Sequence, residues 1–271
     1  MKKLLHMDFK NIINSMNFRA ISIIMISIPI ICFLVNCKIS YGLPIQFVRS
    51  SLEENFLNGT VSRHVKLWFI LIFPLLSMML CSDIYSIQYN NGIYKSIITR
   101  CSKKKYILSK IIVVFALTFS VIFISLFINQ VLCIITFPLK GLDNAMALPA
   151  FDIGYFNYSD SRFLDLLRVQ NTCLYNLVYM LIYSLVGALY AIIALSTSFF
   201  IKNSKVFIIS IFIIYFGVYE FFITQGLEKF HLNSYLDGDS VGNGVFIAWI
   251  FVLVVIPFVF TAIKYKSKNE I

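Results

Sequence analysis

Charged side chains are scarce in this sequence. Asp, Glu, Lys and Arg make up only 13% of its 271 residues, whereas 59% are hydrophobic and the mean hydropathy is +0.83. A soluble domain needs about 25% charged residues to cover its surface. The composition therefore excludes an ordinary water-soluble protein and indicates a chain whose solvent is lipid.

Local signatures of nucleotide and metal binding are missing as well. The P-loop pattern Gly-x-x-x-x-Gly-Lys-[Ser/Thr] is absent, so the chain cannot bind ATP through that loop. Its six cysteines include no Cys-x-x-Cys pair and it has only three histidines, so no metal site can be built from neighbouring residues. We predict that the chain is not an enzyme and holds no metal or cofactor. Cys37 and Cys173 fall near the same predicted face, where a disulfide is one alternative and unpaired apolar thiols the other.

Long hydrophobic runs are what the sequence has in abundance. Six of them approach the ~20 residues that a helix needs to cross ~30 Å of hydrocarbon. They cover residues 20–35, 65–81, 107–137, 173–201, 206–224 and 245–263. Backbone groups in lipid must bond to one another, so such spans are helices, and the alternating strands of a membrane barrel are not seen. We predict an all-α integral membrane protein with six transmembrane helices in a single domain, 1–271.

The distribution of charge predicts the orientation of these spans. With the N-terminus inside, the inner segments hold 15 Lys and Arg against 3 acids, and the rest of the chain holds 8 against 10. This is the positive-inside bias, which predicts a multi-pass protein of the cell membrane with both termini cytoplasmic. Topology thus accounts for the net charge of +10, and we predict no nucleic-acid partner.

Two segments outside the spans have a recognisable character. Residues 2–19 predict an amphipathic helix that lies in the membrane interface, with a charged leader to the first span as the alternative. Its apolar face consists of Leu5, Phe9, Ile12, Ile13 and Met16. The main extracellular segment is predicted at residues 138–172, where acidic residues suit an outer face.

A few polar residues near the predicted span ends allow more than one interpretation. We expect Glu53 and Glu54 in the first outer loop to be a solvated acidic pair. We expect Asn129 and Gln130 to lie at the outer interface, where polar groups cost little. Glu220, late in the fifth span, is a candidate for the substrate path, with a structural role as the alternative. No ionisable residue is left at mid-depth, unlike in ion-coupled carriers, so any uphill transport would draw its energy from another chain.

The densest basic cluster lies between the second and third spans, in residues 88–105. An apolar series recurs there with helical spacing at Ile93, Tyr94, Ile97, Ile98 and Cys101. This spacing predicts a two-turn helix across the inner ends of the spans, with an apolar side and a basic end. A plain inner loop explains the lysines but not the apolar periodicity. We therefore interpret the segment as a docking element for a cytoplasmic partner.

The same segment resembles the permease subunits of ABC-2 type transporters. That family often reads Glu-x-x-x-Gly-Thr, an apolar segment, Pro-x-Ser-Arg, and then Ser/Gly-Lys opening a span. The corresponding residues here are Gln88 to Gly92, Ile93 to Thr99, Cys101-Ser102-Lys103 and Ser109-Lys110. Gly92 and Lys110 match, whereas Gln88 replaces the family's acid and Lys103 its arginine. The run from Leu195 to Asn203, the six-span layout and the leading helix are similar to that family too.

The resemblance implies an ABC-2 permease fold, of the type V exporter kind, in a dimer with a second copy or a paralogue. It also implies a separate cytoplasmic ABC ATPase that binds ATP and Mg²⁺, and a coupling helix from Gly92 to Ser102 that docks into it. The residues expected to contact the ATPase are Gln88, Gly92, Ile93, Tyr94, Ile97, Ile98, Arg100, Cys101 and Lys103. We expect an exporter of an amphipathic or hydrophobic substrate (peptide, drug or lipid), surrounded by membrane lipids. The alternative is a non-transporting immunity or sensor subunit for an antimicrobial peptide.

Overall fold

The computed structural model describes residues 2–44, 48–59, 62–81, 83–139, 161–200 and 204–266. Its helices in chain order are α1 (Lys2–Ile13), α2 (Met16–Ser40), α3 (Arg63–Leu80), α4 (Asp83–Asn90), α5 (Ile93–Ile98), α6 (Lys103–Thr136), α7 (Asp165–Gln170), α8 (Thr172–Ser198), α9 (Ser204–Thr224), η3 (Glu228–Phe230), α10 (Leu232–Asp237) and α11 (Asn243–Lys266). Within these ranges there is no strand, only an isolated bridge between Arg162 and Val241.

Most of the long helices are apolar enough to cross a membrane. By length and composition five qualify, namely α2, α3 counted on to Tyr89, α6, α8 and α11. In α9 the apolar stretch that can be described is shorter, at Ile208–Thr224. The prediction of an all-α, multi-pass membrane protein is confirmed at this level. The helices lie close to the six predicted spans and mostly run past them, because polar residues at their ends continue the helix beyond the apolar core.

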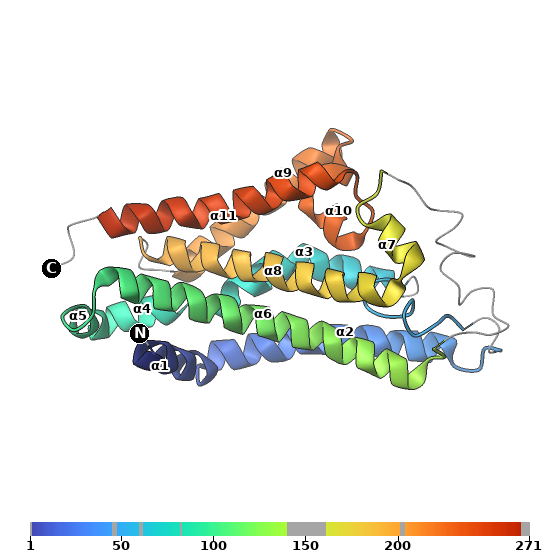
Figure 1. The fold of residues 1–271 in the computed structure, drawn as a ribbon, viewed down its shortest axis with the longest axis horizontal. Coiled ribbons are helices and arrows are strands. Elements are labelled where there is room, and N and C mark those ends of the chain that lie inside the picture. Colours follow the sequence, from blue (N-terminus) through green and yellow to red (C-terminus); the bar gives the residue numbers. More distant parts are fainter. Residues whose placement is uncertain are drawn as a thin grey trace.

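The long helices run lengthwise beside one another (Figure 1). The start of α1, the helix α5 and the last turn of α11 gather at one end of the bundle, which we call the α5 end. The short helices α7 and α10 lie at the opposite end, which we call the α10 end. The first helix therefore begins, and the last helix ends, at the same end of the bundle.

The helix α8 forms the centre of the bundle and packs mainly on α6 and α3. Every side chain from Val186 to Ser198 is buried. At Gly187 the neighbours approach so closely that an added Cβ would stand 2.2 Å from Cδ1 of Ile122 and 2.9 Å from Cζ of Phe73. Small residues of this kind let membrane helices gain packing contacts, so α3, α6 and α8 meet at Gly187.

The N-terminal helix is shorter than predicted, and it buries an acid. α1 ends at Ile13, and α2 begins at Met16 with Ser15 as its N-cap. The buried side chains of α1 are Asp8 and Ile12, whereas Phe9 and Met16, both on the predicted apolar face, are 44% and 79% exposed. α1 packs on α6, α2 and α4. Asp8 faces the interior of the bundle because it forms an ion pair there with Lys110 of α6, which is also buried.

The prediction of a solvated Glu53–Glu54 pair is wrong, whereas the interfacial position of Asn129 and Gln130 stays a prediction. Glu53 and Glu54 are 3% and 2% exposed, so they are not a solvated pair. The loop that carries them folds onto the bundle and is held there by side chains of α6. Oδ1 of Asn129 accepts the Phe56 N–H at 2.8 Å, and Gln130 donates to the Ser51 carbonyl at 3.2 Å. Buried backbone groups need such partners, which explains why two amide side chains sit there.

Burial leaves one of these acids in an unfavourable setting. Both carboxylate oxygens of Glu54 are buried without a hydrogen-bond partner in the described part of the chain. Burial raises the pKa of Glu54, although the charge of Arg49 acts in the opposite direction. The loop is held through the backbone instead, because the Glu54 carbonyl accepts from Nδ2 of Asn36 at 2.8 Å.

The close approach at Gly187 predicts opposite effects for two helical glycines. Gly187→Ala should destabilise the protein by about 1–3 kcal/mol because the new methyl group overpacks the junction. Gly217→Ala, on α9, should be neutral or stabilise by up to about 1 kcal/mol, since nothing lies within 4 Å of its added Cβ. Thermal unfolding of the two variants in the same detergent gives the comparison. Equal shifts in Tm would contradict the packing assigned to Gly187.

Candidate functional site

The predicted coupling segment forms a short helix at the α5 end. α4 ends at Asn90, and Gly92 takes a left-handed conformation with φ +70° that starts α5. α5 lies across the end of the bundle (Figure 1) and stops at Ile98. The next helix begins at Lys103, so the helix is shorter than the two turns expected from Gly92 to Ser102, and Cys101 lies beyond its end.

The apolar series on this segment divides between inside and outside. Tyr94 is 3% exposed and packs among the rings of Tyr85, Tyr89 and Tyr106, with centroids 5.3–5.8 Å apart. Ile97 and Ile98 are half-buried against the core. Ile93 is 43% exposed. Packing on the protein's own bundle therefore accounts for much of the periodicity, and Ile93 is the apolar residue left at the surface.

The remaining predicted contact residues also fall into different environments. Gly92 and Arg100 are exposed, and Cys101 and Lys103 are half-buried. Gln88 is 4% exposed. The Gln88 side chain is thus occupied inside the bundle in this conformation, and its contact with a partner protein stays a prediction.

Gln88 belongs to a buried polar network beneath α5. At its centre Lys110 of α6 forms an ion pair with Asp8 of α1, and both side chains are 0% exposed. Ser109 donates to the second carboxylate oxygen of Asp8 at 2.7 Å. Gln88 donates to Asp8 at 3.3 Å and accepts from the Tyr106 hydroxyl at 2.9 Å. The network ties α1, α4 and α6 together directly under the short helix.

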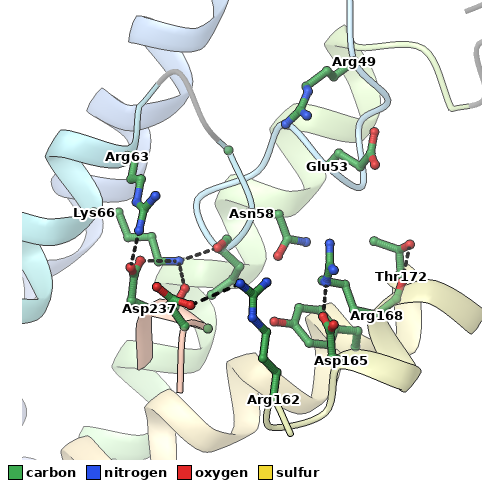
Figure 2. Close-up of a pocket in the computed structure, with 15 residues that line it drawn as sticks. Arg49, Glu53, Asn58, Arg63, Lys66, Arg162, Asp165, Arg168, Thr172 and Asp237 are labelled. Carbon is green, nitrogen blue, oxygen red and sulfur yellow. Dashed lines mark hydrogen bonds and ion pairs between the residues drawn. The ribbon is translucent and has the colours of Figure 1, made fainter. Parts of the chain in front are cut away.

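The α10 end contains a charged cavity of about 230 Å³ (Figure 2). It is bordered by the loop after α2, the first turn of α3, the segment around α7 and the end of α10. Five basic and four acidic side chains line it, namely Arg49, Arg63, Lys66, Arg162 and Arg168 with Glu53, Asp165, Asp237 and Asp239. Sequence reasoning missed this site, since its residues are spread over five segments that share no motif.

Asp237 is the main acceptor on one wall of this cavity. Its carboxylate lies 3.0 Å from Nζ of Lys66 and 3.0 Å from Nη2 of Arg63. Lys66 also donates to the carbonyls of Leu57 and Asp237, at 2.6 and 2.7 Å. Burial alone would raise the pKa of Asp237, but its two cationic partners outweigh burial and hold that pKa below its ordinary value. The pair fixes α10 to the start of α3.

Two arginines occupy the facing wall. Nε of Arg168 donates to Asp165 at 2.7 Å within α7, and Nη2 of Arg162 lies 3.5 Å from Asp239. The pairs differ in exposure, because the Arg168 and Asp165 side chains are 14% and 5% exposed whereas those of Arg162 and Asp239 are 35% and 48% exposed. The cavity thus has a desolvated floor and a hydrated rim.

The end of α10 is positioned by side chains of the central helices. The Tyr183 hydroxyl of α8 donates to the Leu236 carbonyl at 2.8 Å. Trp249 of α11 donates to the Phe230 carbonyl at 2.8 Å. His231, which is fully buried, caps α10 by accepting the Asn233 N–H at 3.2 Å. These hydrogen bonds hold Asp237 in place at the α10 end of the bundle.

Residues 238–242 read Gly-Asp-Ser-Val-Gly, which matches the pattern Gly-x-Ser-x-Gly. This match was not taken into account in the sequence analysis. In hydrolases this pattern presents an exposed serine on a turn between a strand and a helix. Here it follows α10, and Ser240 is fully buried. Gly238 and Gly242 have φ of 88° and 80°. The string therefore forms the turn between α10 and α11, in a setting unlike a nucleophile elbow.

The other residues singled out in the sequence lie apart from this cavity. Glu220 is exposed on α9 and is not among the residues that line it. Cys37 is half-buried, Cys173 is exposed, and both are free thiols. Among the described residues, no group of three or more His, Cys, Asp or Glu is arranged to hold a metal ion.

Comparison with known proteins identifies no relative. No protein-family model, no curated protein and no solved structure matches this chain. The membrane fold and the two sites described here are therefore the basis for any functional assignment.

Loss of one partner from the buried pair under α5 should be costly. Asp8→Asn leaves the Lys110 ammonium buried without its counter-charge, and we expect a loss of about 3–5 kcal/mol. The double variant Asp8→Asn, Lys110→Met should recover part of this loss because it removes the unpaired charge. Lys105→Met, at an exposed position of the same helix, is the control. Thermal unfolding in detergent measures the wild type, Asp8→Asn, Lys110→Met, the double variant and the control, and strictly additive losses from the two single changes would contradict the ion pair.

Asp237 should make the stability depend on pH in the acid range. Because its pKa is lowered by folding, its contribution is present above the ordinary carboxyl pKa and is lost as pH falls through the lower folded value. Asp237→Asn should cost about 3 kcal/mol at neutral pH and should flatten this acid-side slope. Asp239→Asn, at the exposed rim, should cost less than about 1 kcal/mol. Melting curves from neutral pH down to about pH 3 test both; an unchanged slope in Asp237→Asn would refute the assignment.

Proposed function

We propose that this chain is the membrane-spanning permease subunit of an ATP-driven ABC exporter of the ABC-2 class. In this proposal it works as a dimer with a second copy or a paralogue, and a separate cytoplasmic ATPase binds ATP and Mg²⁺. The observation that carries the proposal is α5, a short helix lying across the bundle end between α4 and the long helix α6. It is joined to them by the Tyr94 ring cluster.

The surroundings of α5 suit a coupling element. Lys95 is exposed on α5 beside Ile93, and Arg100 is exposed just beyond the end of the helix, so the free surface of this segment is basic with one apolar residue. The Asp8–Lys110 network fixes the ends of α4 and α6 beneath it. A force applied to α5 would therefore move two membrane helices together, because a packed and hydrogen-bonded end cannot absorb the displacement locally.

The mechanism in this proposal is mechanical. ATP closes the ATPase pair in the cytoplasm, the closing ATPases push α5, and the helices attached to it rock to open a path toward the α10 end. The excess of basic residues in the segments at the α5 end supports a cytoplasmic location for that end. The ATPase supplies the energy, and this chain forms the route for an amphipathic or hydrophobic substrate. Glu220, which is exposed on α9, stays a candidate residue of that route.

Association with an ATPase tests the proposal directly. The chain should co-purify in mild detergent with the ABC ATPase encoded nearest to it, and the complex should hydrolyse ATP. Ile93→Asp should reduce the recovered ATPase at least tenfold, because it puts a charge at the exposed apolar position of α5 without disturbing the core. Tyr265→Asp, at a residue 56% exposed near the end of α11, is the matched control.

The result can go against the proposal in two ways. If no ATPase co-purifies in any detergent, the exporter assignment fails, and an immunity or sensor subunit that works without ATP becomes the better account. If an ATPase binds equally well to the Ile93→Asp variant, the exporter assignment survives but α5 is not its docking element.

A further inference from the structure

A second hollow adjoins the charged cavity at the α10 end. It is a groove of about 360 Å³ beside α3, α9 and α10, with an apolar wall formed by Leu67, Trp68, Ile70, Leu71 and Tyr219. Asp237 lines both the groove and the charged cavity. Trp68 is 69% exposed there. A charged hollow that borders an apolar one suits a ligand with a polar head and an apolar tail.

The charged cavity contains a donor that the protein leaves unused. Nε of Arg168 bonds to Asp165, but its Nη2 is buried and has no hydrogen-bond partner within the described residues. Figure 2 shows this guanidinium directed into the cavity, between Asn58 and Thr172. A buried donor without a partner costs about 1–3 kcal/mol. An oxyanion bound at Nη2 would remove that cost and form a charge-assisted bond.

The charge balance of the cavity indicates how much negative charge fits. Its lining carries five basic and four acidic side chains, an excess of one positive charge. Within the lining, Asp237 pairs with Arg63 and Lys66, Asp165 with Arg168, and Asp239 with Arg162. A singly charged oxyanion such as a phosphodiester balances the site. A more highly charged anion would meet the carboxylates of the same walls.

The height of the site along the bundle favours a lipid over a dissolved ion. The cavity is lined by Arg63 at the start of α3 and by Thr172 at the start of α8, two helices that are long and apolar enough to cross a membrane. The ends of such helices lie at the level of the headgroups. Trp68, little more than one turn further along α3, is of the type enriched at that interface.

From these observations we propose that the cavity binds the phosphodiester headgroup of a phospholipid. Arg168 donates to a phosphate oxygen, and one acyl chain lies in the groove beside Trp68. The site belongs to this chain alone and does not depend on an ATPase or on transport, so it can be tested separately from the proposed function.

Quenching of tryptophan fluorescence tests the site on the purified full-length chain in detergent. A phosphatidylglycerol with brominated acyl chains should quench the emission saturably, and Trp68→Phe should remove most of that quenching. Arg168→Gln should weaken the apparent affinity about tenfold, the loss of one charge-assisted bond. Arg168→Lys keeps the charge and should weaken it less. Arg100→Gln, an exposed arginine at the α5 end, should leave the affinity unchanged.

Three outcomes would overturn the proposal. A brominated diacylglycerol, which lacks the phosphate, would quench with equal affinity if only the apolar groove mattered. Inorganic phosphate would displace the lipid at equal concentration if the cavity took the free ion. Arg168→Gln and Arg168→Lys that both elute as folded protein with wild-type affinity would rule out the arginine as the phosphate donor.

Discussion

The buried ion pair between Asp8 and Lys110 determines how the α5 end is built. Two opposite charges without solvent are tolerated only where the geometry is good and their other bonding positions are filled. Ser109 and Gln88 supply those bonds. The pair turns α1 so that its acid faces the bundle and fixes α6 against α4. Because Tyr106 connects Gln88 to the rings under α5, the position of α5 depends on the ion pair as well.

A single helix, α3, connects this network to the cavity at the other end. Its first turns carry Arg63 and Lys66, which hold Asp237 of α10. Its other end leads through α4 into α5. Both ends of the α3–α4 unit are thus fixed by polar contacts, while its middle contains the buried Pro74 and packs on α8 at Gly187. A displacement at one end can reach the other because packed helices shift between discrete arrangements rather than deform.

The spans could be predicted from sequence because lipid imposes long apolar runs, and these runs are the helices observed. The inward folding of the first outer loop could not be predicted from the sequence. Nothing local links Asn55 to Gln130, whose side chains bond at 2.6 Å across the bundle. Glu54 was expected to be solvated because acids in loops usually are, yet backbone bonds hold that loop inside. The cavity was missed for the same reason. Arg168 and Asp237 are far apart in the sequence, and only the fold brings them to the walls of one cavity.

The network also shows how a neutral residue can stand at position 88 beside a buried lysine. Gln88 carries no charge, so by itself it would leave the Lys110 ammonium buried without a counter-charge. In this chain the carboxylate comes from α1 instead, as Asp8, and Gln88 bonds to it as a neutral member of the same network. The charge of the lysine is thus balanced from another helix, and position 88 can hold an amide. The environment of a buried lysine is therefore better judged by the net charge of its whole network than by the residues next to it in the sequence.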